Sequence, residues 1–202
     1  MNSLYLEEYI NIFERVLSVG YINNYSTPSI ERLISYSSYF QGIEKDKSGF
    51  APISEDNAII KEFFPDFKKG LLDVKVYNQC LWAAESYLRI QGETGLTFEC
   101  IFQYISINKM YEYFPLYHEM DFSHIINEFK RLYEDKSVLS ILIDKYHYSL
   151  MDISKRTGIS YDMLSSLKQR RRDIRKASVE IVTKLSQIFN VRIETIGEIV
   201  IK

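Results

Sequence analysis

The sequence predicts a mainly α-helical protein made of two domains, residues 1–134 and 135–202. Three observations support this prediction: apolar residues recur at helical spacing along most of the chain, charge is unevenly distributed, and aromatic residues gather in the first part. A length of 202 residues is compatible with one large core or two small ones. Hydrophobic residues make up 46% of the chain and charged residues 26%, which excludes wholesale disorder and low-complexity classes.

The charge distribution gives the two domains different expected partners. Residues 136–202 contain 13 Lys and Arg against 7 Asp and Glu, whereas residues 1–135 contain 12 against 20, although the whole chain carries only −2. This asymmetry favours a C-terminal domain that binds a polyanion, attached to an acidic domain that does not itself bind nucleic acid. Of the 29 Phe, Tyr and Trp residues, 25 precede residue 136, which predicts an aromatic core or an aromatic-lined interface there.

The first helices are predicted from apolar periodicity and from residues that start or stop helices. Apolar positions between 6 and 17 predict an amphipathic helix that ends at Gly20. Residues 42–53 mix charge, Gly and Pro, and are expected to form an exposed loop. Ser54 is then a candidate cap for a helix that runs to about Phe64, before Pro65.

Further helices are predicted for residues 74–90 and 122–133, and a turn is expected between Gly92 and Gly95. The stretch 98–105 fits a helix through its apolar spacing, but a β-hairpin over residues 88–99 is an open alternative. No internal repeat is present in the sequence.

From Ser137 onward, the sequence predicts five short helices, and a tight turn around Gly158 joins the second to the third. Ser149, with Asp152 three residues later, has the spacing of a capping box, and Ser160 is a second cap. A sharp helix–helix turn needs a small residue at the contact and Gly at a positive φ, which Ser154 and Gly158 supply. The following residues are spaced to form the shared core: Ile153, Ile159, Leu164 and Leu167.

Over residues 137–197, this pattern resembles the lambda repressor and Cro type (XRE-like) of helix-turn-helix family. The resemblance is carried by ISKRTGISYDMLSSL, and continues through SVEIVTKLSQIFNVRIETI, which looks like the family's fourth helix, its turn and its last short helix. It covers about a third of the chain, and residues 1–134 resemble no family that we can name. The resemblance implies a five-helix DNA-binding domain whose third helix, from Tyr161 to about Gln169, enters the major groove of double-stranded DNA.

The candidate DNA contacts follow from that orientation of the third helix. If Leu164 and Leu167 face the core, the residues on the opposite side face base edges. The candidate base contacts are Tyr161, Asp162, Ser165, Ser166 and Gln169. Basic residues near both helices are candidate contacts to backbone phosphates. They are Lys155, Arg156, Lys168, Arg170, Arg171, Arg172, Arg175 and Lys176.

Other kinds of site find little support in the sequence. His118 and His124 are six residues apart, which separates their rings by about 240° around a helix, so a metal site is not expected. No phosphate-binding glycine loop, nucleophile elbow or HExxH motif occurs, so we expect neither an enzyme nor a cofactor. Cys80 and Cys100 are expected to be buried thiols in a reducing compartment. No membrane span or leader is predicted, and a cytoplasmic location is expected.

The sequence therefore predicts a sequence-specific transcriptional regulator, a repressor that binds a near-palindromic operator as a homodimer. Residues 1–134 would serve dimerisation, sensing, or the binding of a protein or small molecule. A helix-turn-helix pattern also occurs in proteins that do not bind DNA, but here a basic run adjoins it in an otherwise acidic chain. The alternative is an antitoxin or immunity protein of a mobile element with an autoregulatory helix-turn-helix. A third class, an enzyme targeted to DNA, lacks a recognisable catalytic cluster.

Overall fold

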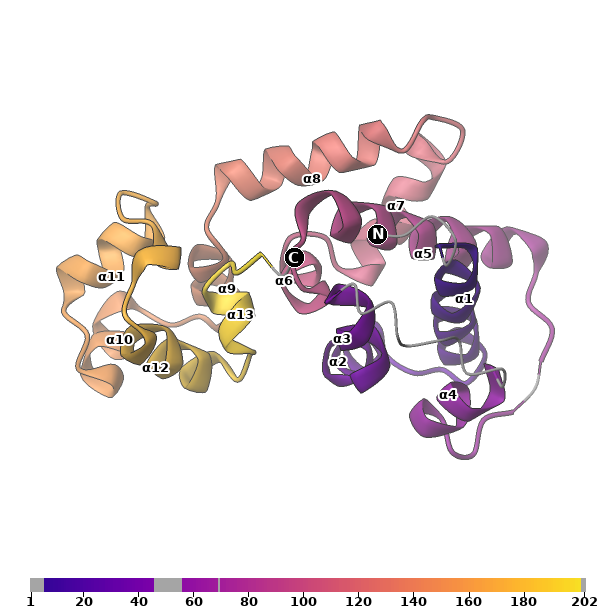
Figure 1. Ribbon diagram of the computed structural model, residues 1–202, viewed down its shortest axis with the longest axis horizontal. Coiled ribbons are helices and arrows are strands. Elements are labelled where there is room, and N and C mark those ends of the chain that lie inside the picture. The colour runs from indigo at the N-terminus through magenta and orange to yellow at the C-terminus, as the bar shows by residue number, and fades with distance from the viewer. Residues whose placement is uncertain (1–5, 46–55, 69, 201–202) are drawn as a thin grey trace.

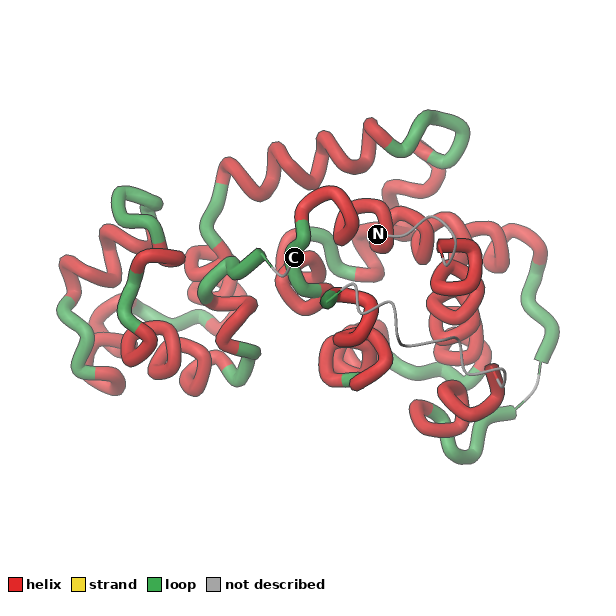
Figure 2. Tube along the Cα trace, viewed as in Figure 1, coloured by secondary structure: helices red, strands yellow, loops and turns green. Residues whose placement is uncertain are grey.

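The computed structural model describes residues 6–45, 56–68 and 70–200, and this part of the chain consists of helices and connecting loops without a β-strand (Figures 1 and 2). The prediction of a helical fold is confirmed, and residues 98–104 form a helix. The α-helices are α1 Leu6–Ile22, α2 Thr27–Tyr36, α3 Ser38–Glu44, α4 Asp56–Phe63, α5 Val74–Thr94, α6 Phe98–Tyr104, α7 Ile107–Tyr117, α8 Ser123–Asp135, α9 Val138–Tyr146, α10 Leu150–Thr157, α11 Tyr161–Lys168, α12 Val179–Phe189 and α13 Ile193–Ile196. A short 3₁₀ helix, η2, spans Ile174–Lys176. None of these helices is long and apolar enough to cross a bilayer.

Aromatic side chains from several helices form the centre of the first hydrophobic core, whose buried residues lie between positions 9 and 129. Phe13 of α1 lies 5.0 Å from Phe40, 5.5 Å from Phe98 and 5.7 Å from Tyr87, measured between ring centroids. All four rings are fully buried, and the Tyr87 hydroxyl donates to the Ile105 carbonyl at 3.0 Å. The abundance of aromatic residues in this half therefore corresponds to a core in which edge-to-face contacts predominate.

Several predicted helix ends differ from the observed ones because tertiary packing overrides local signals. The first helix continues through Gly20 to Ile22, and a side chain at Gly20 would collide with Ile30 of α2. Gly20 therefore permits the close approach of two helices instead of ending one. Gly92 lies inside α5, which ends at Thr94 and has Gly95 as its C-cap, with φ +68. Residues 42–44, expected in a loop, belong to α3, and the predicted cap Ser54 lies outside the described residues.

A second, separate hydrophobic core is built from α9 to α13. Its buried residues are Val138, Leu139, Leu142, Ile143, Ile153, Ile159, Leu164, Leu167, Ile174, Val182, Leu185, Phe189, Val191 and Ile196. In Figure 1, these helices form the orange and yellow lobe, and α8 connects this lobe to the rest of the chain along one side. The two cores meet where α6 contacts both α9 and α13, and Tyr104 of α6 packs against both of them.

Buried polar and charged side chains also make contacts across this junction. The guanidinium of Arg192, which is the N-cap residue of α13, makes a bidentate contact with the Glu44 carboxylate at 2.8 and 3.0 Å. Its backbone N–H and the Thr195 hydroxyl both donate to Glu99, at 2.8 and 2.6 Å. We call Arg192, Glu44, Glu99 and Thr195 the Arg192 cluster. Because the two glutamates belong to the first half of the chain, the cluster links the two cores.

Candidate nucleic-acid interface

The turn between α10 and α11 has the local geometry that the sequence predicted. The Ser149 hydroxyl accepts from the Asp152 N–H at 3.1 Å, and the Asp152 carboxylate accepts from the Ser149 N–H, which completes the capping box. Gly158 ends α10 in the left-handed region at φ +70 and donates its N–H to the Ser154 carbonyl. The Ser160 hydroxyl then accepts from the Met163 N–H and starts α11. These contacts satisfy backbone groups that both helix ends would otherwise leave unpaired.

The same turn determines which face of α11 is buried. Ile153, Ile159, Leu164 and Leu167 all lie in the second core and are at most 6% exposed, as predicted. Of the candidate base contacts, Tyr161, Asp162 and Gln169 are exposed, while Ser165 and Ser166 are half-buried on the flank of the helix. The Tyr161 ring is 49% exposed although it is aromatic. The N-terminal end of α11 is therefore open to a large partner.

Most of the candidate phosphate contacts border this helix and reach solvent. Arg171, Arg172 and Lys176 are exposed. Arg171 Nη2 lies 3.4 Å from the Ser165 hydroxyl, which is long for a hydrogen bond, and Arg172 Nη1 lies 3.5 Å from the Met163 sulfur, which is a weak acceptor. Contacts this weak hold a guanidinium loosely, so both side chains can turn toward an anion.

The other basic side chains are more constrained. Arg175 is paired with Asp173 at 2.9 Å, and this pairing holds the pKa of the Asp173 carboxyl below its usual range. Lys168 is half-buried, with its ammonium 3.9 Å from Asp144. Lys155 is exposed on α10. Arg156 stacks on the Tyr148 ring at 5.0 Å and donates to its hydroxyl at 3.1 Å.

Arg170 differs from the other predicted phosphate contacts because its guanidinium is turned toward the protein. Its Nη2 lies 2.6 Å from the Tyr133 carbonyl oxygen, 3.0 Å from that of Lys136 and 3.1 Å from the Glu198 carboxylate. All three contacts are made by Nη2 alone, and the side chain is 33% exposed, so the phosphate contact of Arg170 stays a prediction. Nη2 is turned toward the protein because burial leaves Glu198 in need of a cation, and Arg170 is the cation that reaches it.

Sequence reasoning missed the residues that connect the two halves: Glu44, Glu99, Tyr104, Tyr133, Arg192 and Glu198. Their partners are 28 to 148 positions away along the chain, as for Arg170 with Glu198 and Arg192 with Glu44. Neither spacing nor composition signals such a pairing. One sequence signal was present at Arg192, a basic residue directly before a short helix, where a helix N-terminus normally favours acidic residues.

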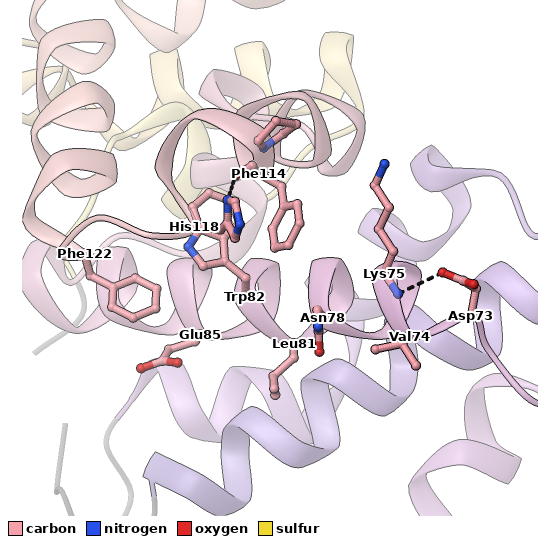
Figure 3. A pocket seen from close by; sticks show the side chains of 11 residues that line it. Asp73, Val74, Lys75, Asn78, Leu81, Trp82, Glu85, Phe114, His118 and Phe122 are labelled. Carbon is pink, nitrogen blue, oxygen red and sulfur yellow. Dashed lines mark hydrogen bonds between the residues drawn. The ribbon is translucent and has the colours of Figure 1, made fainter.

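The first half of the chain contains a separate, largely apolar groove of about 940 Å³ between α5 and the end of α7 (Figure 3). Trp82 and Phe114 meet edge-to-face at 5.8 Å on its floor, and His118 stacks on Phe114 at 4.4 Å. The Nδ1–H of His118 donates a hydrogen bond to the Phe114 carbonyl at 2.8 Å. Nε2 is therefore the ring nitrogen that can accept a hydrogen bond from another group. In the described part of the chain, no His, Cys, Asp or Glu cluster is placed to hold a metal ion.

Comparison of the chain with models of protein families, with curated proteins and with solved structures finds no match. The geometry of the chain's own residues is therefore the basis on which a function can be proposed.

Proposed function

We propose that the protein is a sequence-specific DNA-binding transcriptional regulator in which α10 and α11 act as a helix-turn-helix and α11 enters the major groove. The observation that carries the proposal is the combination of an exposed α11 N-terminus with loosely held basic side chains directly after the same helix. Residues 137–197 form the DNA-binding part, in line with their resemblance to the lambda repressor and Cro type of domain. The protein acts as a repressor by occupying its site.

Each part of this surface has a distinct role in the proposal. Tyr161 and Asp162 face the groove at the leading edge, and Gln169 lies at the trailing end of α11. Gln can pair with adenine, Ser can donate or accept, and Asp can accept from the cytosine amino group. Arg171, Arg172 and Lys176 neutralise phosphates and release the counterions condensed on them. Asp162 also stabilises the α11 N-terminus through the helix dipole.

The test is a selection of random duplex DNA with the full chain, followed by affinity measurements over a range of salt concentrations. Replacing Arg171, Arg172 and Lys176 by Ala is expected to lower the salt slope by about 0.9 per lost phosphate contact, and to weaken specific and non-specific duplexes alike. Gln169→Ala is expected to alter sequence preference with little change in the slope. Lys130→Ala, an exposed lysine of α8 paired with Glu93, is the control that should leave both unchanged.

The proposal would be refuted if the full chain selected no preferred duplex sequence. It would also be refuted if the variant with Ala at Arg171, Arg172 and Lys176 kept the wild-type salt slope.

The proposed regulator binds as a homodimer. One helix contacts only a few base pairs, so two copies about 34 Å apart on a near-palindromic site are needed for useful affinity. The selected duplex should therefore contain two half-sites, and the complex should have the mass of two chains on one duplex. A single half-site bound by one chain would contradict this part of the proposal.

A second candidate function, a partner-binding protein with an autoregulatory DNA-binding domain, is favoured by the groove between α5 and α7. Its apolar floor lies beside Val74, which is 72% exposed, and none of its lining residues belongs to the second core. Purification of the full chain from its native host distinguishes the candidates. A stoichiometric protein partner that is lost when a charge enters the groove, as in Leu81→Glu, supports this second function, and a lone homodimer contradicts it.

A further inference from the structure

Arg170 occupies an unusual position at the end of the proposed recognition helix. It follows α11 by two residues, and its N–H donates to the Leu167 carbonyl at 3.1 Å, so its backbone is still attached to the last turn. Its φ is +54, a left-handed conformation that costs a non-glycine residue of the order of 1 kcal/mol. Backbone strain of this kind persists only where surrounding contacts hold the residue in its conformation, and Arg170 makes several such contacts.

The side chain of Arg170 lies in a cluster that contains residues from both halves of the chain. Besides the three oxygen atoms already described, its Nη2 lies 3.3 Å from the Tyr104 hydroxyl, and its guanidinium carbon lies 4.7 Å from the centre of the Tyr133 ring. Tyr104 belongs to α6 and Tyr133 to α8 of the first half. We call Arg170, Glu198, Tyr104, Tyr133 and the Lys136 carbonyl the Arg170 cluster.

Glu198 is the anionic centre of this cluster. Its side chain is 4% exposed, and it also has a left-handed φ, of +46. Its carboxylate accepts from the Tyr133 hydroxyl at 3.0 Å, from the Val138 N–H at 2.9 Å and from Arg170. Two strained residues, 28 positions apart, thus meet through their side chains at the junction of the two cores. This amounts to a built polar site, since each charged group has specific partners.

The tyrosine hydroxyls are suited to remain protonated donors there. Burial, together with the nearby Glu198 charge, raises the pKa of Tyr133 to about 12, and the pKa of Tyr104 also rises, mainly through burial. Both hydroxyls therefore stay protonated at neutral pH, and the cluster ties the end of α11 to α6 and α8.

We propose that Arg170 is a positioning residue, which fixes the orientation of α11 relative to the first half of the chain and does not neutralise a DNA phosphate. This inference rests on the proposed function and concerns how the recognition helix is held. In a dimer, the two recognition helices must present themselves at a fixed separation and angle. The planar guanidinium stacks on the Tyr133 ring at 4.7 Å while its Nη2 points at two carbonyls and a carboxylate, and this combination fixes an angle that a lysine ammonium does not.

The test compares Arg170 with its neighbour Arg171, whose side chain makes no contact that would hold it to the described part of the first half of the chain, each replaced by Ala and by Lys in the full chain. Affinity is measured against the selected duplex and against random duplex over a range of salt concentrations. For Arg170→Ala and Arg170→Lys, we expect an unchanged salt slope, unchanged non-specific affinity, and about a tenfold loss of specific affinity, within the range found for residues that touch neither ligand. For Arg171→Ala, the slope should fall by about 0.9, and Arg171→Lys should behave as wild type.

The results separate the two roles of Arg170. A salt slope that falls in Arg170→Ala and is restored in Arg170→Lys assigns a phosphate contact and overturns the proposal. Wild-type specificity in both variants overturns it as well, because the cluster would then be unnecessary for recognition.

Two further measurements separate a loss of the positioning role from a loss of folding and from a failure of the proposed function. Tyr104→Phe removes one hydroxyl of the cluster while leaving every charge in place, and it should show a smaller specificity loss with the same slope. Without DNA, hydrogen exchange at residues 161–170 should be faster in both Arg170 variants than in wild type, and unchanged exchange refutes the positioning role. A wild-type chain that selects no duplex would instead refute the proposed function, while hydrogen exchange without DNA would still decide whether Arg170 holds α11 in place.

Discussion

Replacing Arg192 by Ala tests whether the Arg192 cluster couples the two cores. The Arg192 side chain is 11% exposed, and that of its main partner Glu44 is 1% exposed. In the variant, Glu44 loses the bidentate contact and keeps one donor, the Phe98 N–H at 2.7 Å. Glu99 retains the Thr195 hydroxyl at 2.6 Å. The substitution therefore leaves Glu44 as the less compensated of the two buried carboxylates.

The expected loss in the free energy of unfolding is about 3–5 kcal/mol, the range for removal of one partner of a buried ion pair. The loss should depend on pH. Burial raises the pKa of Glu44, and hydrogen bonding and attraction from Arg192 oppose that rise. Without Arg192, the pKa rises further, and the folded state then binds more protons than the unfolded state. The stability of the variant must therefore fall as pH rises through the raised pKa.

The assay is equilibrium denaturation followed by two probes. Trp82 is the single tryptophan and lies in the first core, so its fluorescence reports unfolding of that half, whereas far-UV circular dichroism reports all helices. In the wild type, the two transitions should coincide, because the halves are coupled. In Arg192→Ala, the midpoints should separate. The double variant Arg192→Ala with Glu44→Gln should recover part of the lost free energy of unfolding, because Gln removes the unpaired buried charge.

Lys184→Ala is the matched control, because Lys184 forms an exposed pair with Glu180 at 2.6 Å, with side chains 39% and 74% exposed. Such pairs contribute at most about 0.5 kcal/mol. A loss in Arg192→Ala no larger than in this control, with coincident transitions, would refute the coupling argument.

Three other substitutions test the local structure, each by denaturation of the full chain. Gly158→Ala should lose about 1–2 kcal/mol, because φ is +70 while space for a Cβ is open; an unchanged stability would contradict the assigned backbone. Ser149→Ala should lose about 1 kcal/mol by removing the α10 cap, and a loss equal to that of Ser140→Ala would count against the capping box. Burial raises the pKa of Glu14, so its stabilising effect is present below the unfolded pKa and is lost as pH rises. Glu14→Gln should therefore gain stability relative to wild type as pH rises above the ordinary Glu pKa of 4.5, and a stability difference that does not change with pH would refute this assignment.

Much of the candidate interface was predictable because it depends on residues close together in sequence. A capping box needs two residues three positions apart, and the turn needs one glycine at a positive φ, so Ser149, Asp152 and Gly158 suffice. The buried face of α11 likewise follows from the helical repeat that places Leu164 and Leu167 on one side. Helix ends were less predictable, since Gly20 carries a stop signal that the packing of α2 overrides.

By itself, the sequence determined the helical class, the acidic and basic halves, the caps and the exposed side of α11, because each follows from composition or from spacing within a few turns. Only the tertiary structure decided which basic side chains remain open to a partner. Arg170 and Arg171 are neighbours of the same chemical type and both reach solvent, yet Nη2 of Arg170 is held by groups from α6, α8 and the C-terminal segment, whereas Arg171 makes a long contact to the nearby Ser165. A buried carboxylate recruits whichever cation the fold brings within reach, and that choice is made by contacts across the chain.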